Sequence, residues 1–372
     1  MNEITKSSFK LGFGMMRLPR KTAEEIDIEQ TKEMVDRFLE AGGRYFDTAY
    51  VYQGSEDAIR QALCERYPRD SYLLASKLNA ADFCCKSEEE ARGEIHVSLE
   101  RTGAQYLDLY LLHGLSEGSI SRYEEYRLWD YVRELKEQGL IRHYGFSFHD
   151  KAEILDQLLN DHPDTEFVQL QINYADWEGE DVQSRACYEV AEKHGVPVIV
   201  MEPVKGGLLA DPPKAVKDLL TAANPQASPA SWAIRFAASL PGTAVILSGM
   251  SDIEQVEDNL SYMKDFKPLT DKEQETIVKA REILDGLDKI PCTSCAYCMP
   301  GCPVKISIPG IFAVMNIYKM YDNLSKARME YVVRPLGPRA SECIACGQCE
   351  SACPQHLPII SLLEEAKEKL EV

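Results

Sequence analysis

The chain has 372 residues, of which 45% are hydrophobic and 27% charged, and its formal net charge is −19. This composition argues for a folded globular protein, and the negative charge argues against nucleic acid and anionic membranes as partners. Because no apolar run approaches the roughly 18–20 residues of a membrane span, and residues 1–10 lack the apolar stretch of a secretory signal, we expect a soluble, cytoplasmic protein.

Strand-sized apolar runs alternate with amphipathic helical stretches through most of the chain. The predicted strands are Leu11–Met16, Arg44–Asp47, Tyr72–Lys77, Tyr106–His113, Arg142–Ser147, Phe167–Gln171, Val196–Met201 and Thr243–Ser248. The predicted helices between and after them include Gln30–Glu40, Glu56–Cys64, Ser87–Arg101, Tyr126–Gln138, Lys151–Leu159, Gln183–Lys193, Pro229–Ala237 and Ile253–Tyr262. Buried strands joined by helices form a parallel sheet. Eight such units predict an α/β protein with a closed (β/α)8 TIM barrel.

A doubly wound Rossmann sheet is the main alternative to the barrel. It should carry a Gly-x-Gly-x-x-Gly turn after a strand, and the segment Leu11-Gly-Phe-Gly-Met15 lacks the third glycine. We therefore predict a barrel over residues 1–285 and a second, smaller domain over residues 286–372.

Polar side chains end several of the predicted strands. Asp47, Lys77 and His113 end three successive strands, and Ser147 ends the next. Taken alone, Asp47 fits a turn cap, Lys77 a surface residue and His113 a packed core histidine. In a barrel, however, the chemistry lies where the strands end, so the three together indicate an active site.

Several motifs in this region resemble those of the aldo/keto reductase family. The similarity covers about residues 8–285 and is spread over most strands. The motifs are Phe46-Asp47-Thr48-Ala49-x-x-Tyr52 followed by Ser55-Glu56, then Ser76-Lys77, Asp108-Leu-Tyr-Leu-Leu-His113, Gly145-Phe-Ser147 and Gln255-Val-Glu-Asp258-Asn259.

The resemblance implies an NAD(P)H-dependent oxidoreductase that reduces a small-molecule carbonyl to an alcohol, or catalyses the reverse reaction. Tyr52 would be the general acid, and His113 would polarise the carbonyl oxygen. Lys77, oriented by Asp47, would lower the pKa of Tyr52 from its ordinary value of roughly 10.

The resemblance also implies the residues that bind NADH or NADPH. Ser147, Gln171 and the first-strand backbone would hold the nicotinamide, the Lys205-Gly206-Gly207 loop would follow the pyrophosphate, and the last motif would bind the adenosine. The full set is Gly14, Met15, Asp47, Ser147, Gln171, Lys205, Gly206, Gly249, Gln255, Asp258 and Asn259.

The sequence departs from the family pattern at three places. His149 lies two residues after Ser147 where the family usually has Asn directly after the serine, and the tyrosine that stacks on the nicotinamide is replaced near Met201-Glu202. Two acids, Asp252 and Glu254, lie where the family has basic residues that hold the 2′-phosphate of NADP. We therefore expect NADH to be used at least as well as NADPH.

The cysteines point to iron–sulfur chemistry in the C-terminal region. Eight of the twelve form two identically spaced runs, Cys292-x2-Cys295-x2-Cys298-x3-Cys302-Pro and Cys343-x2-Cys346-x2-Cys349-x3-Cys353-Pro. Zinc sites more often use separated pairs, commonly mixed with His, so we predict two [4Fe–4S] clusters. In two-cluster ferredoxins the fourth cysteine of each run ligates the other cluster.

That rule assigns the ligands of each predicted cluster. One cluster takes Cys292, Cys295, Cys298 and Cys353; the other takes Cys343, Cys346, Cys349 and Cys302. Helices predicted over Pro309–Tyr318, Asn323–Tyr331 and Ile359–Leu370 make the region resemble α-helical ferredoxin modules.

The purpose of the clusters stays open at the sequence level. Hydride transfer moves two electrons together and a cluster moves one, and no clear flavin motif connects the two. The clusters could be structural, or they could be the working centres of an electron-transfer protein whose barrel docks a redox partner protein. Of the remaining cysteines, Cys64 and Cys187 fit packed positions, and Cys84-Cys85 lie in a loop that could border the active site.

Overall fold

The computed structural model describes residues 9–22, 25–81, 84–180, 182–292, 296, 298–334, 336–353 and 355–371. The chain divides into two compact units. The first comprises Met1–Ala210 and Ala223–Ile277, and the second comprises Asp211–Ala222 and Val278–Val372. The expected domain boundary at residue 285 stays a prediction.

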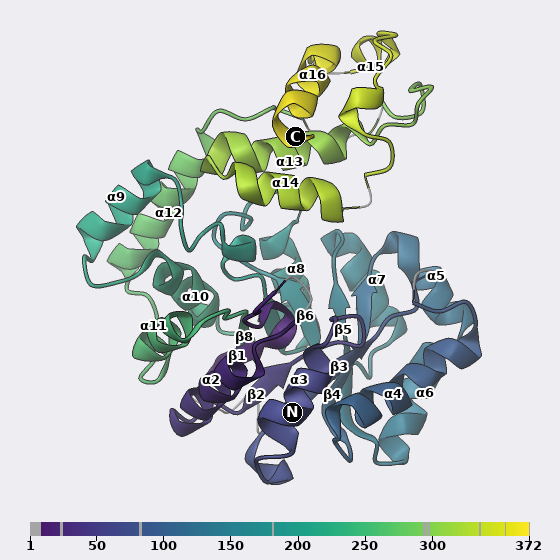
Figure 1. Ribbon diagram of the computed structural model, residues 1–372, viewed down its shortest axis with the longest axis vertical. Helices are drawn as coiled ribbons and strands as arrows, with labels where there is room; N and C mark the ends of the chain where they lie inside the picture. The colour runs from purple at the N-terminus through teal and green to yellow at the C-terminus, as the bar shows by residue number, and fades with distance from the viewer. Residues whose placement is uncertain are drawn as a thin grey trace. The chain divides into compact units, whose positions relative to one another are not determined.

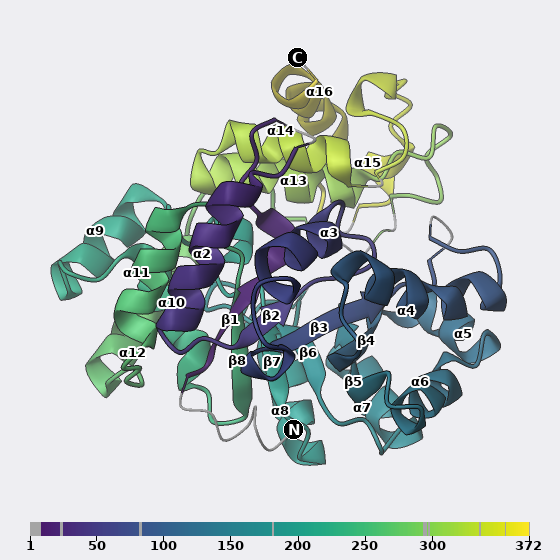
Figure 2. The same ribbon diagram turned by 60° about the horizontal axis from the view of Figure 1, so that its bottom comes forward.

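The first unit is built on a closed barrel of eight parallel strands in chain order, in which β8 pairs with β1. The strands are β1 (Leu11–Gly14), β2 (Tyr45–Asp47), β3 (Leu73–Leu78), β4 (Leu107–Leu115), β5 (Ile141–Phe148), β6 (Val168–Gln171), β7 (Val198–Met201) and β8 (Thr243–Ser248). They lie at the positions of the predicted strands and form the predicted (β/α)8 fold, with the strands grouped centrally in this unit (Figures 1 and 2).

Helices follow the strands in the alternation that the sequence predicts. They are α2 (Ile28–Glu40), α3 (Ser55–Ile59), α4 (Glu88–Thr102), α5 (Glu117–Glu125), α6 (Leu128–Glu137), α7 (Ala152–Asp161), α8 (Ser184–His194), α10 (Pro229–Ser239) and α11 (Ile253–Met263). The helix predicted over residues 56–64 is α3 followed by a wider π-helical turn, Arg60–Cys64. Among the described residues, no helix combines the length and the apolar character needed to cross a bilayer.

The alternation of side chains along each strand separates two layers of core. A cluster that includes Tyr45, Ala75, Leu109 and Leu111 is distinct from the larger apolar core to which the buried residues of the surrounding helices belong. Because side chains on one face of a strand recur every second residue, Asp47 shares the face of Tyr45, and Lys77 shares that of Ala75. The inner face is therefore apolar along most of its length and polar where the strands end.

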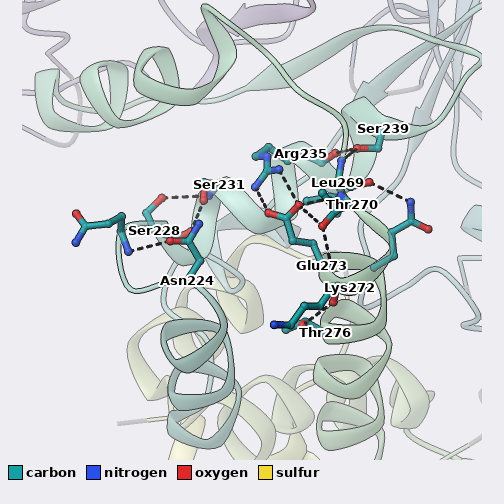
Figure 3. Close-up of polar contacts among 12 residues, drawn as sticks. Asn224, Ser228, Ser231, Arg235, Ser239, Leu269, Thr270, Lys272, Glu273 and Thr276 are labelled. Carbon is teal, nitrogen blue, oxygen red and sulfur yellow. Dashed lines mark hydrogen bonds and ion pairs between the residues drawn. The ribbon is translucent and has the colours of Figure 1, made fainter.

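Hydrogen bonds drawn in Figure 3 hold helix α10 at its start and against α12 (Asp271–Asp285). Ser228 caps the N-terminus of α10 by accepting a hydrogen bond from the Ser231 amide at 3.1 Å (Figure 3). Further along α10, Arg235 forms hydrogen bonds of 2.8 and 3.2 Å with the carboxylate of Glu273, near the start of α12. These contacts fix both the start and the outer face of α10.

The regular secondary structure of the second unit is helical, and its described residues contain no strand. Its helices include α9 (Lys214–Ala223, whose last residue belongs to the first unit), α13 (Ile308–Tyr321), α14 (Leu324–Val333), α15 (Gln348–Ser351) and α16 (Ile359–Leu370). Helices α13 and α14 lie side by side (Figures 1 and 2), and their buried side chains include Phe312, Met315 and Tyr331. The helical character expected of this region is confirmed.

The close approach of β5 and β6 at Gly145 generates the first prediction. A Cβ at residue 145 would lie 2.1 Å from the carbonyl oxygen of Phe167, a backbone atom that cannot rotate away. Gly145→Ala should therefore lower the free energy of unfolding by roughly 1–3 kcal/mol, the usual cost of overpacking. Urea unfolding followed by circular dichroism measures this free energy of unfolding.

Gly93→Ala in α4 is the matched control, because a Cβ there would meet no atom within 4 Å. Alanine is the better helix former by up to about 1 kcal/mol, so this variant should be as stable as the wild type or more stable. Equal stability of the two alanine variants would contradict the packing described for Gly145.

Candidate active site

Lys77 lies at the centre of the polar end of the barrel. Its side chain is fully buried, with 0% exposure, and its ammonium is hydrogen-bonded to the Asp47 carboxylate. The same nitrogen donates to the backbone carbonyl of Thr48 at 2.6 Å. Burial lowers the pKa of Lys77, but the charges of Asp47 and Tyr52 outweigh burial and hold it above its ordinary value. Lys77 is therefore a fixed, buried cation at neutral pH.

Asp47 is held from a second direction. Gln169, on β6, donates from its side-chain amide to the other carboxylate oxygen at 3.1 Å. Strand β2 is also in register with β3 at this point, where Asp47 pairs with Ala75. Both carboxylate oxygens are thus engaged, which fixes the direction in which Asp47 meets Lys77.

Tyr52 lies in the loop between β2 and α3. The Lys77 ammonium is 4.9 Å from the centre of the Tyr52 ring. Burial raises the pKa of Tyr52 and outweighs the opposing effect of Lys77, so the net direction is upward. The predicted net lowering of the Tyr52 pKa is wrong, because the sequence does not reveal how deeply the phenol is buried. The effect of Lys77 on this pKa has the predicted sign.

His113 faces Tyr52 edge to face, with the ring centres 5.8 Å apart. Burial, followed by the charges of Lys77 and His149, lowers the pKa of His113 well below its ordinary value. Its Nδ1 is buried and has no hydrogen-bond partner among the described residues. A neutral imidazole has one N–H to donate, so His113 can serve as an uncharged hydrogen-bond donor.

Tyr52, His113 and Asp47 line a cavity of about 810 Å³ within the first unit. This volume lies in the range of small-molecule and cofactor sites. Ser228, Ala230 and Ile234 of the braced α10 segment line the cavity as well. The cavity wall therefore combines the polar strand ends with the start of a fixed helix.

The predicted cofactor-binding residues fall into two groups. Those that line the cavity are Gly14, Asp47, Gly206, Gly249, Gln255, Asp258 and Asn259. Met15, Ser147, Gln171 and Lys205 are not part of its described lining.

The second group is engaged elsewhere. The Met15 carbonyl accepts from Ser55 at 2.9 Å, and the Ser147 hydroxyl accepts from the Gly114 amide at 2.7 Å. The Gln171 amide donates to Asp176 at 3.2 Å, and Lys205 forms an ion pair with the same carboxylate. Direct cofactor contacts by these residues stay predictions.

The start of α11 carries the predicted adenosine motif. Asp252 caps the helix by accepting from the Gln255 amide at 2.8 Å. Asp258 accepts from Ser228 at 2.7 Å, and Asn259 donates to Ser248 at 2.7 Å. The motif is thus held rigidly against neighbouring segments at the edge of the cavity.

Three residues that the sequence reasoning did not single out also bear on the site. Gln169 both lines the cavity and orients Asp47, and it could have been found because it shares a strand face with Gln171. Arg17 lines the cavity and donates to the Gly206 carbonyl at 3.3 Å. His149, which was noted only as a departure from the family pattern, lines the cavity and has its pKa lowered by burial.

Two small cavities in the second unit gather the predicted cluster ligands. One is lined by Cys302 together with Cys343, Cys346 and Cys349. The other is lined by Cys353 together with Cys292 and Cys298; Cys295 lies outside the described residues. Each cavity thus combines thiols from both runs, and the buried Ile308 lines both cavities. Thiols enclosed by apolar side chains fit the ligand chemistry of iron–sulfur clusters.

Comparison with known proteins identifies the family. The profile of the aldo/keto reductase family matches residues 10–282, and that of a 4Fe-4S dicluster domain matches residues 291–357. The chain therefore belongs to the aldo/keto reductase family and carries a C-terminal 4Fe-4S dicluster domain. An aldo-keto reductase of Mycolicibacterium vanbaalenii is 31% identical over 270 residues, covering 71% of this chain and 86% of the relative.

Solved structures agree with this assignment. An aldo-keto reductase from Bacillus halodurans, in its holo form, is 26% identical with a TM-score of 0.56, covering 73% of this chain and 91% of that one. An aldo-keto reductase from Klebsiella pneumoniae, solved with NADPH, has a TM-score of 0.58 at 22% identity, covering 73% of this chain and 90% of that one. The latter likeness supports the fold.

The pairing of thiols in the two cavities generates the second prediction. If Cys302 belongs with the second run, Cys302→Ser, Cys346→Ser and their double variant should each retain about half the wild-type iron, because all three lose the same cluster. Cys353→Ser combined with Cys346→Ser should lose nearly all of it. Iron and sulfide content of anaerobically purified protein measures this.

Cys64→Ser is the control, since Cys64 lines neither thiol cavity and should leave the iron content unchanged. The reverse outcome, in which Cys302→Ser with Cys346→Ser removes all the iron while Cys353→Ser with Cys346→Ser keeps half, would assign each fourth cysteine to its own run.

Proposed function

We propose that the protein is an NAD(P)H-dependent oxidoreductase that interconverts an aldehyde or ketone and the corresponding alcohol. One observation carries the proposal: a fully buried Lys77 links Asp47 to Tyr52, beside a neutral His113, at the wall of a cavity of about 810 Å³. Each of these groups suits one task in carbonyl reduction.

The cavity suits a nicotinamide dinucleotide. Its lining includes the backbone of Gly14, Gly206 and Gly249, where the lack of a side chain permits close approach. The N-terminal turn of α11 also lines it, and helix N-termini favour phosphate groups. A bound reduced nicotinamide would supply the hydride to the carbonyl carbon.

The chain's own residues would manage charge and protons during the reaction. Tyr52 holds a proton at neutral pH, because burial keeps its pKa above the ordinary value. It would donate that proton to the carbonyl oxygen as negative charge develops there. Lys77 would stabilise the phenolate that remains, and His113 would donate a hydrogen bond to the same oxygen.

The third prediction tests Tyr52. Tyr52→Phe should lower kcat/KM for aldehyde reduction by at least about 100-fold, the low end of what a general acid contributes, while the visible absorption of the clusters stays unchanged. Tyr50→Phe is a matched control in the same loop, because the Tyr50 ring packs against Arg101 and does not line the cavity. It should keep wild-type turnover.

Unchanged turnover in Tyr52→Phe would remove the basis for a carbonyl reductase. It would favour the second candidate, an electron-transfer protein whose clusters are the working centres. One observation favours that candidate: the loop Ile344–Cys346, which includes a predicted ligand of the second-run cluster, is exposed, with Ile344 at 63%.

The fourth prediction concerns the cofactor. Asp252 and Glu254 both line the cavity, and a carboxylate near the ribose would repel a 2′-phosphate and accept a hydrogen bond from a 2′-hydroxyl. Wild-type kcat/KM for NADH should therefore equal or exceed that for NADPH. Glu254→Lys should shift the ratio toward NADPH without removing the Asp252 helix cap.

Steady-state kinetics with both cofactors at a fixed carbonyl concentration measure this ratio. A large excess of kcat/KM for NADPH in the wild type would show that these two acids do not face the cofactor ribose.

A further inference from the structure

Glu202 occupies an unusual position directly after β7. It lines the same cavity as Tyr52 and His113. Its backbone has φ of 55°, in the left-handed region that non-glycine residues seldom adopt. It also precedes Pro203, which restricts the preceding residue to extended conformations. The backbone at Glu202 is therefore disfavoured on two counts.

A network of hydrogen bonds holds Glu202 in this conformation. Its carbonyl oxygen accepts from the buried Asn173 side chain at 3.3 Å and from the Lys205 amide at 2.9 Å. Asn173 also donates to Asp176 at 2.8 Å, and Asp176 forms an ion pair with Lys205. Strained residues persist where surrounding structure over-determines them, commonly at functional sites.

The carboxylate of Glu202, in contrast to its backbone, is not engaged. The residue is exposed and belongs to the cavity lining, and its side chain makes no hydrogen bond or ion pair within the part of the chain that the structure describes. Unlike Asp47, which is paired with Lys77, this acid has no partner among the described residues to offset its charge.

The charge of Glu202 reaches the reacting end of the cavity. Burial raises the pKa of Tyr52 most, and the carboxylates of Asp47 and Glu202 add to that effect. His113 and His149 are neutral at neutral pH, since burial lowers the pKa of both. With Lys77 and Asp47 offsetting each other, Glu202 adds negative charge to the cavity wall that also includes Tyr52 and His113.

We propose that Glu202 selects carbonyl substrates by charge, an inference that rests on the proposed function. A substrate whose carbonyl oxygen accepts the Tyr52 proton occupies the cavity that Glu202 also lines. Carbonyls that carry a carboxylate are rejected there, and carbonyls that carry an ammonium group are favoured. Two unit charges several ångströms apart in a partly enclosed site change kcat/KM by roughly tenfold or more.

The experiment uses the full-length holoprotein with saturating NADH and three aldehydes of similar size. These are 4-carboxybenzaldehyde, 4-(trimethylammonio)benzaldehyde and 4-methylbenzaldehyde. In Glu202→Gln, kcat/KM should rise about tenfold for the carboxylate and fall by a similar factor for the ammonium compound. It should change by less than about twofold for the neutral one. Glutamine keeps the backbone contacts of Glu202.

Competitive inhibition by benzoate and by benzyltrimethylammonium provides a readout that does not depend on the chemical step. Benzoate should bind more tightly to Glu202→Gln than to the wild type, and the ammonium compound more weakly. Glu180→Gln is the matched control, because Glu180 is exposed, lies outside the described cavity lining and carries the same charge. Glu180→Gln should leave the order of kcat/KM among the three aldehydes unchanged.

Two outcomes would overturn the inference. If Glu202→Gln changes kcat/KM equally for all three aldehydes, the residue acts in cofactor binding or folding. If Glu180→Gln shifts the three kcat/KM values in the same way as Glu202→Gln, the effect comes from the net charge of the protein. Failure of the proposed function is distinguishable, since it would appear as full turnover in Tyr52→Phe or as no reduction of any of the three aldehydes by the wild type.

Discussion

The buried ammonium of Lys77 is the interaction on which the candidate site depends. A charge with 0% side-chain exposure is costly unless it is paired and hydrogen-bonded. The Asp47 carboxylate and the Thr48 carbonyl meet that requirement, and both lie at the end of β2, whose register with β3 places them there. The same arrangement places the Lys77 ammonium 4.9 Å from the centre of the Tyr52 ring.

The contact between Gln169 and Asp47 depends on closure of the barrel. Gln169 on β6 reaches Asp47 on β2 only because the sheet closes on itself, and the two residues are 122 positions apart in the chain. The polar side chains Asp47, Lys77, His113 and Gln169 come from β2, β3, β4 and β6, and each separately would suit a cap or a packed core. Their meeting at one end gives an otherwise apolar interior the polar groups that the proposed proton transfer requires.

Much of this could be predicted from the sequence, because the relevant signals are local. Asp47, Lys77 and His113 end apolar runs, and the two cysteine runs have a spacing that few other sites share. The net pKa direction of Tyr52 could not be predicted, because it depends on burial by distant segments. Helix α5 was not predicted, since its only buried residue is Tyr123. Arg17 gave no sequence signal for a site role, because its position depends on the short 3-10 turn after β1, and Glu202 was marked only as part of a departure from the family pattern.

The central claim is that Lys77 acts on catalysis through Tyr52. The most direct measurement is kcat/KM for aldehyde reduction by Lys77→Met, Tyr52→Phe and the double variant, each checked for a native circular dichroism spectrum. If Lys77 works through the phenol, the double variant should lose no more activity than the more impaired single variant, because groups that act as a unit are non-additive. Losses that multiply in the double variant would contradict the claim.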